Sequence, residues 1–223
     1  MAAAGTSPAL NLREKLAELA GLKQRVSPDL VRCDFGNLVT NGTFDTDVTG
    51  WTASGSGDIT FSSVSSKMEI VRGAGGIGGF PYQIISVEPG LRYLVSAEVV
   101  GAAAVFHAGT SIGAADYAQI TALLPDPDAF TPTQNLMVLA SWADTSSTST
   151  LDNVSLYEAD PSDDAPWLRL PYGYKVGQRG MIVRDGVILH PSDYTEITDS
   201  GQTFIKPIVA PGVSTEFSIW AGA

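Results

Sequence analysis

Two short motifs in this chain match patterns that enzymes use for catalysis or cofactor binding. Gly109-Thr-Ser111-Ile-Gly113 has the spacing of a nucleophile elbow, in which a serine hydroxyl attacks an acyl carbon. That elbow requires a parallel sheet followed by a helix, and an acid and then a histidine later in the chain. The only later histidine is His190, and no alternation of strands and helices surrounds Ser111. The motif therefore does not indicate a hydrolase.

The second motif is a glycine run, Gly73-Ala-Gly-Gly-Ile-Gly78, which satisfies the dinucleotide fingerprint. The fingerprint needs a helix that opens at its last glycine, so that backbone N–H groups face the pyrophosphate. Here Gly79-Phe80-Pro81 leads into another strand pattern, and a chain with 23 glycines offers many chance matches. We therefore expect a protein that is not an enzyme and requires no cofactor.

Charge and composition exclude further classes of function. A formal net charge of −11 and a pI near 4.4 are unsuited to duplex nucleic acid or an anionic membrane surface, which attract basic proteins. Cys33 is the only cysteine, so neither an intrachain disulfide nor a cysteine-built zinc site is expected. The first residues do not resemble a signal peptide, and no apolar run approaches the roughly 20 residues of a membrane span. We expect a protein made in the cytoplasm, without membrane insertion.

The first element that the sequence predicts is a helix over residues 8–26, within an N-terminal domain at 1–28. Its apolar positions recur with helical spacing and form a stripe of Leu12, Leu16, Leu19 and Val26. A single helix of this length is marginally stable in water. The stripe must therefore be buried on this chain, on a copy of it, or on another protein, and we expect it to mediate docking or oligomerisation.

The rest of the chain is expected to be mostly β. Short alternating runs with Gly and Pro turns predict a β-sandwich at 34–159, including a hairpin that pairs 82–87 with 92–99. The acidic, proline-flanked stretch 160–166 marks a boundary. Beyond it, Asp185-Gly186 between two apolar runs predicts a type I′ hairpin in a small β module at 167–223.

Two stretches of the larger domain resemble a known family. Asn37-Leu-Val-Thr-Asn-Gly-Thr-Phe-Asp45 and Leu151-Asp-Asn-Val-Ser-Leu-Tyr-Glu158 are similar to the first and last strands of the jelly-roll β-sandwiches in carbohydrate-binding module families four and nine. The resemblance implies that these strands pair and close one domain. It also implies a structural calcium held by Asp45 and Asp152, although two turn-forming aspartates would look the same.

The same resemblance suggests where a sugar would bind. Such folds present aromatic rings and planar polar groups in a groove, which makes Tyr82, Tyr117 and Trp142 the glycan-binding candidates by residue type. The alternative is that these aromatic side chains belong to the core, as aromatic residues in alternating strands usually do.

The C-terminal module resembles a second family. Val183-Arg-Asp-Gly-Val-Ile-Leu-His-Pro-Ser-Asp-Tyr-Thr195 is similar to a small β-sandwich module that recurs in tail fibres and other appendages of tailed bacteriophages. The order of helix, jelly roll and appendage module implies a structural protein of a virion, such as a head (capsid) decoration, neck or tail appendage. Its expected partners are other virion proteins, copies of itself and, for host attachment, a host surface polysaccharide. The alternative is a bacterial carbohydrate-binding module protein with no role in a virion.

Overall fold

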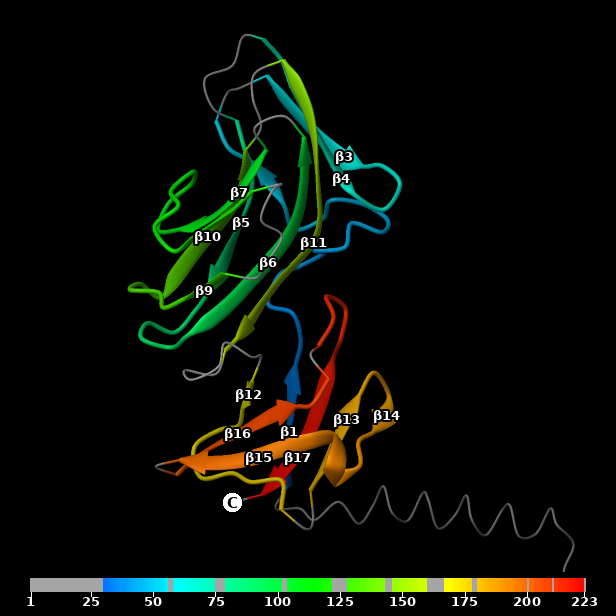
Figure 1. Ribbon diagram of the computed structural model, residues 1–223, viewed down its shortest axis with the longest axis vertical. Helices are drawn as coiled ribbons and strands as arrows, with labels where there is room; N and C mark the ends of the chain where they lie inside the picture. The colour runs from blue at the N-terminus through cyan, green and yellow to red at the C-terminus, as the bar shows by residue number, and fades with distance from the viewer. Residues whose placement is uncertain are drawn as a thin grey trace, which may run out of the picture.

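A computed structural model describes ten stretches of the chain, and every structural statement below refers to them. They are residues 30–55, 58–74, 79–101, 104–121, 128–142, 146–159, 167–177, 180–199, 201–209 and 211–222. The expected helix at 8–26, with its stripe of Leu12, Leu16, Leu19 and Val26, lies outside these residues. Within them the chain is mostly β and forms two sandwiches, one above the other in Figure 1.

The larger sandwich consists of two antiparallel five-stranded sheets. One sheet has the order β2 (Thr52–Ala53), β5 (Pro81–Ser86), β10 (Leu136–Trp142), β7 (Val105–Gly109) and β8 (Ala118–Thr121). The other has the order β3 (Ile59–Ser63), β4 (Met68–Arg72), β11 (Ser147–Glu158), β6 (Tyr93–Gly101) and β9 (Asp128–Phe130). Alternate side chains of both sheets enter one shared core, as the period-two patterns predict.

The connection between β5 and β6 differs from the expected hairpin. β5 pairs with β10 and β2, whereas β6 pairs with β11 and β9 in the opposite sheet. The turn at Glu88–Leu91 therefore carries the chain from one sheet to the other. The hydroxyl of Tyr93 accepts a hydrogen bond from the Glu88 N–H at 2.9 Å, which fixes this arch. Turn residues identify a reversal of the chain, but they do not distinguish a hairpin from an arch.

The smaller sandwich also has two sheets around its own core. The first has the order β1 (Leu30–Phe35), β17 (Phe217–Gly222), β13 (Met181–Arg184) and β14 (Val187–Ile188). The second has the order β12 (Leu168–Arg169), β16 (Gln202–Pro207) and β15 (Tyr194–Asp199), and a short 3-10 helix, η1 (Pro191–Asp193), precedes β15. The predicted hairpin is confirmed, because Asp185 and Gly186 between β13 and β14 have φ of 49° and 81°.

β1 extends the smaller sandwich beyond the expected 167–223. It pairs along its whole length with β17, from Leu30 opposite Gly222 to Phe35 opposite Phe217, and the two strands lie side by side in Figure 1. Residues 34 and 35, which we expected in the larger domain, therefore belong to the smaller one. The larger sandwich is inserted between β1 and β12, so two chain crossings join the domains.

The segment 37–45 was expected to be a strand but consists of turns. Asn41 and Phe44 have φ of 52° and 53°, a left-handed conformation that a strand does not allow. The segment nevertheless lies along β11, as the resemblance implied. The side chain of Asn37 forms hydrogen bonds that a neighbouring strand would otherwise make with β11. Its Nδ2 donates to the Val154 carbonyl at 2.8 Å, and its Oδ1 accepts from the Leu156 N–H at 2.9 Å.

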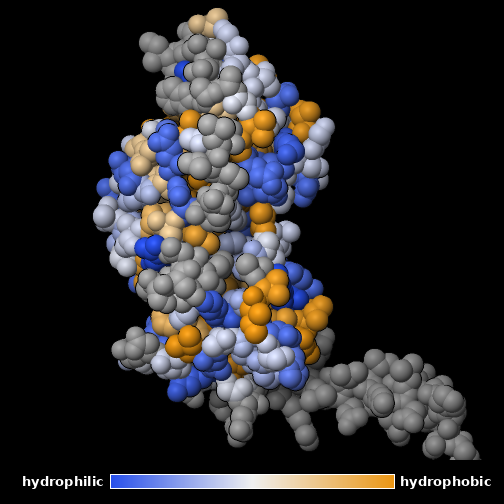
Figure 2. All heavy atoms as spheres, in the orientation of Figure 1, coloured by the Kyte–Doolittle hydropathy of each residue, from blue (hydrophilic) through white to orange (hydrophobic). Residues whose placement is uncertain are grey.

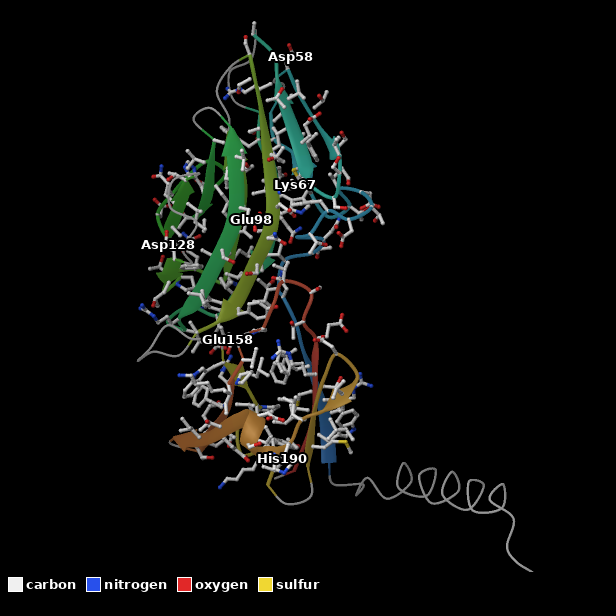
Figure 3. All side chains as sticks on the ribbon, turned by 45° about the vertical axis from the view of Figure 1, so that its right-hand side comes forward. Asp58, Lys67, Glu98, Asp128, Glu158 and His190 are labelled. Carbon is white, nitrogen blue, oxygen red and sulfur yellow. The ribbon has the colours of Figure 1, made fainter. Side chains whose placement is uncertain are left out.

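Polar contacts hold the two sandwiches together at their junction. Arg169 in β12 forms ion pairs with Glu88 at 2.6 Å and with Glu158 at the end of β11 at 3.2 Å, and Figure 3 labels Glu158 at this level. The hydroxyl of Tyr157 donates to the Gly212 carbonyl at 2.7 Å. Among the described residues, no helix is long and apolar enough to cross a membrane.

Candidate functional site

The sheet β2-β5-β10-β7-β8 carries an unbroken row of residues across all five strands, on the side away from the core. The pairing places Thr52 opposite Tyr82, Tyr82 opposite Ala140, Ala140 opposite His107, and His107 opposite Gln119. Gln83, next to Tyr82, and Phe106, next to His107, are buried at 7% and 0% exposure, so Tyr82 and His107 face away from the core. We call these five residues the cross-strand row.

His107 is held in one orientation within the cross-strand row. Its Nδ1 lies 3.1 Å from the Gly113 carbonyl oxygen, and a carbonyl can only accept, so Nδ1 donates. In the neutral ring, Nε2 then has a free lone pair and can accept a hydrogen bond from a ligand hydroxyl. Hydrogen bonds from the Thr110 hydroxyl and N–H to the Asp116 carboxylate brace the loop that provides Gly113. The same bonds lower the pKa of Asp116.

The surroundings of the row combine polar groups with apolar surface. Gln119 and Thr52 are exposed, Tyr82 and His107 are half-buried, and Ile84 in the next row is 56% exposed. Together they offer a ring face, an imidazole acceptor, an amide and a hydroxyl on one open surface about 19 Å across, given a strand spacing of about 4.8 Å. Such a surface suits a ligand with apolar C–H faces and many hydroxyls that continues past the binding site.

The three aromatic residues expected to bind glycan have different positions. Tyr82 lies in the cross-strand row. The ring of Tyr117 stacks on Phe130 with centroids 5.4 Å apart and planes at 7°, and its hydroxyl accepts from the Thr133 N–H at 3.2 Å, so this tyrosine packs with the core. Trp142 stands opposite Val105 in the ladder of β10 and β7, and its side chain lies outside the described part of the chain.

The two aspartates expected to bind calcium each have protein partners. Asp45 is exposed and accepts from the Thr43 hydroxyl at 2.8 Å. Asp152 accepts from the Asn153 N–H, and its Oδ2 lies 3.3 Å from the Lys67 ammonium, which also approaches Glu98 at 3.8 Å. Figure 3 labels Lys67 and Glu98 close together beside β4 and β6.

This donor set does not fit a calcium ion. Calcium takes six to eight oxygen ligands, whereas here a lysine ammonium lies against Asp152. Among the described residues there is no group of three or more His, Cys, Asp or Glu side chains that could hold a metal. The positive charge beside Asp152 comes from the chain itself.

The two enzyme-like motifs lie in loops of the larger sandwich. Ser111 is exposed in the turn between β7 and β8, where its carbonyl accepts from the Ala114 N–H at 3.0 Å and Gly113 has a φ of 79°. Gly73 follows β4, and its N–H donates to the Asp58 carbonyl at 2.8 Å. Residues 75–78 of the glycine run lie outside the described residues.

Sequence reasoning missed most of the cross-strand row. Of its five residues, only Tyr82 was among the expected glycan-binding candidates; His107, Thr52 and Gln119 were not. Their alternation within each strand was visible in the sequence, but their alignment depends on the register of four strand pairs. Three of those pairs join strands that are not consecutive in the chain, and nothing local in the sequence sets their register.

Comparisons with known proteins find only distant structural similarity. No family model matches the chain, and no curated protein matches it. A carbohydrate-binding module designated CBM4 is 15% identical, with 53% of this chain and 97% of that chain covered and a TM-score of 0.40. A family 16 carbohydrate-binding module is 16% identical, with 55% and 100% covered and a TM-score of 0.37.

A third similar structure is the enzymatically active domain of tailspike protein 4 from bacteriophage CBA120. It is 15% identical over 54% of this chain, with a TM-score of 0.36, and the match spans only 21% of that chain. Each of the three resembles only part of this chain, and none of them assigns it a ligand or a partner. The class defined here is a two-sandwich β protein with an open polar and aromatic sheet face.

Proposed function

We propose that this is a non-enzymatic binding and structural protein whose larger sandwich contacts a polysaccharide through the cross-strand row. The observation that supports this function is the alignment of Tyr82, His107 and Gln119 on one open sheet face. A tyrosine ring packs against the C–H face of a sugar, while imidazole and amide groups bond its hydroxyls. An open face also accommodates a polymer better than a small molecule, which is usually enclosed.

The setting that we propose is the virion of a tailed bacteriophage, as a head decoration, neck or tail appendage that touches host surface polysaccharide. Support comes from the smaller sandwich, where the Asp185-Gly186 hairpin and the Pro191–Asp193 turn follow the appendage pattern noted in the sequence. The alternative is a bacterial polysaccharide-binding protein outside any virion. Co-sedimentation with phage particles produced by infected cells favours the first, and its absence favours the second.

Substitutions in the cross-strand row test polysaccharide binding. We expect Tyr82→Ala and His107→Ala to weaken binding to capsular or lipopolysaccharide chains about tenfold each, equivalent to a loss of about 1.4 kcal/mol. Tyr172→Ala is the matched control, because Tyr172 is 73% exposed on the smaller sandwich, and it should bind like the unaltered protein. Affinity electrophoresis in gels containing each polysaccharide measures the effect.

Two results would remove the polysaccharide assignment. One is that no polysaccharide in the panel retards the unaltered protein. The other is that Tyr172→Ala weakens binding as much as Tyr82→Ala does, because the effect would then not come from the cross-strand row.

A further inference from the structure

The smaller sandwich has an apolar sheet face that points away from its own core. Met181 in β13 stands opposite Trp220 in β17, and Val183 stands opposite Ile188 in β14, so these four side chains share one face. The alternating residues Ile182 and Ile219 are 1% and 0% exposed and fill the core on the other side. We call Met181, Val183, Ile188 and Trp220 the outer face.

The composition of the outer face is unusual for a two-layer sandwich. A sheet with one face in water normally alternates apolar and polar residues, whereas strands covered on both faces are apolar throughout. β13 has three apolar residues in succession, and Ile188 is 66% exposed. Met181, Val183 and Trp220 are half-buried. Two polar residues border them: the Arg32 guanidinium lies over the Trp220 ring at 5.4 Å and donates to the Ser218 hydroxyl at 3.1 Å. Exposed apolar surface is visible on this sandwich in Figure 2.

The chain itself contains a segment whose apolar side chains must also be buried. Residues 8–26 have a leucine stripe that a short helix cannot leave in water. β1 belongs to the same sheet as the outer face and begins at Leu30, four residues after Val26, the last residue of the stripe. Four residues span at most about 14 Å, which equals the width of this four-stranded sheet at about 4.8 Å per strand spacing.

The size of the leucine stripe also fits. The stretch from Leu12 to Leu19 is about 10 Å long in a helix about 10 Å wide, and the two strand spacings from β17 to β14 amount to about 10 Å. We infer that residues 8–26 dock as a helix on the outer face of the same chain, with Leu12, Leu16 and Leu19 against Met181, Val183, Ile188 and Trp220. This contact forms a third layer and is independent of polysaccharide binding.

A matched pair of substitutions in the full chain tests this docking. Ile188 and Ile208 are both 66% exposed, but only Ile188 belongs to the outer face. Docking hides the trypsin sites at Arg13, Lys15, Lys23 and Arg25. Under conditions in which cleavage follows the undocked population, Ile188→Glu should speed cleavage there about tenfold, and Ile208→Glu should leave it unchanged. Circular dichroism shows that both variants keep their β structure.

A reciprocal change in the segment completes the test. Leu16→Glu should give the same rapid cleavage as Ile188→Glu, and combining the two should add nothing, because each change removes the same contact. Equal cleavage of the Ile188→Glu and unaltered chains would overturn the inference. Light scattering shows whether residues 8–26 dock on their own chain or on a second copy. Dimers that dissociate on dilution and are absent in Leu16→Glu would assign the contact to a second copy and overturn docking within one chain.

Discussion

At the scale of single residues, Lys67 balances the acidic side chains of β11 and β6. The Asp152 carboxylate is only 13% exposed, while Lys67 and Glu98 are 40% and 53% exposed. Lys67→Met leaves the largely buried carboxylate without its cation, and we expect a loss of about 1 kcal/mol in the free energy of unfolding, measured in urea. Adding Asp152→Asn should restore part of it. The pairing would be contradicted if the double variant lost at least as much free energy of unfolding as the two single variants lose together.

The contact between Lys67 and Asp152 also leads to a prediction about calcium binding. If its ammonium provides the charge that balances Asp152, the melting temperature of the unaltered protein should be the same with calcium and with a chelator. A rise of several degrees in calcium that Asp152→Ala removes would instead support the site expected from the sequence. Differential scanning calorimetry at constant ionic strength separates these results, because ionic strength also affects ion pairs.

At the scale of elements, Asn37 joins the irregular segment 37–45 to β11. Its amide side chain bonds to the Val154 carbonyl and the Leu156 N–H, groups that an adjacent strand would otherwise pair. Asn37→Ala should lower stability by about 1–3 kcal/mol, because it leaves partly buried backbone groups unpaired. Asn37→Asp keeps the acceptor for Leu156 but places a carboxylate oxygen against the Val154 carbonyl oxygen, so a loss at least as large as in the alanine variant is expected. Hydrogen exchange at the Leu156 amide should accelerate in the alanine variant; unchanged exchange would contradict the assigned role.

The elements also show how far the sequence predicts this fold. Local signals sufficed for most strands and for the β13–β14 hairpin, where Asp185-Gly186 requires two positive φ values. They failed where pairing is non-local, as between β1 and β17, which lie about 180 residues apart, and at the Glu88–Leu91 arch. They also failed at Gly42, where an added Cβ would lie 2.1 Å from the Val154 carbonyl oxygen. Only glycine allows this close approach of the two backbones, and the positive φ values of Asn41 and Phe44 make the expected strand a series of turns.

At the scale of the whole molecule, the two sandwiches are coupled by a small set of polar contacts. The pairs of Arg169 with Glu88 and Glu158 are partly exposed, and ion pairs in such positions contribute little to stability. The hydrogen bond from the Tyr157 hydroxyl to the Gly212 carbonyl is better shielded, because Tyr157 is 5% exposed. Because the larger sandwich is inserted into the smaller one, loss of this bond affects both domains.

The pH dependence of unfolding tests the Tyr157 contact. Burial, with a smaller contribution from Asp185, raises the pKa of Tyr157 to about 12, against about 10 in the unfolded chain. The neutral hydroxyl therefore stabilises the folded state fully below pH 10, and this contribution is lost as the pH rises from about 10 to about 12. Urea unfolding of the unaltered protein should show a decline across this range that is steeper than in Tyr157→Phe, which has no proton to release. Tyr93 and Tyr194, whose pKa values are also raised, decline equally in both proteins, so their effect cancels in the difference. Parallel curves for the two proteins between pH 9 and 12 would show that the folded protein does not hold Tyr157 in its neutral form.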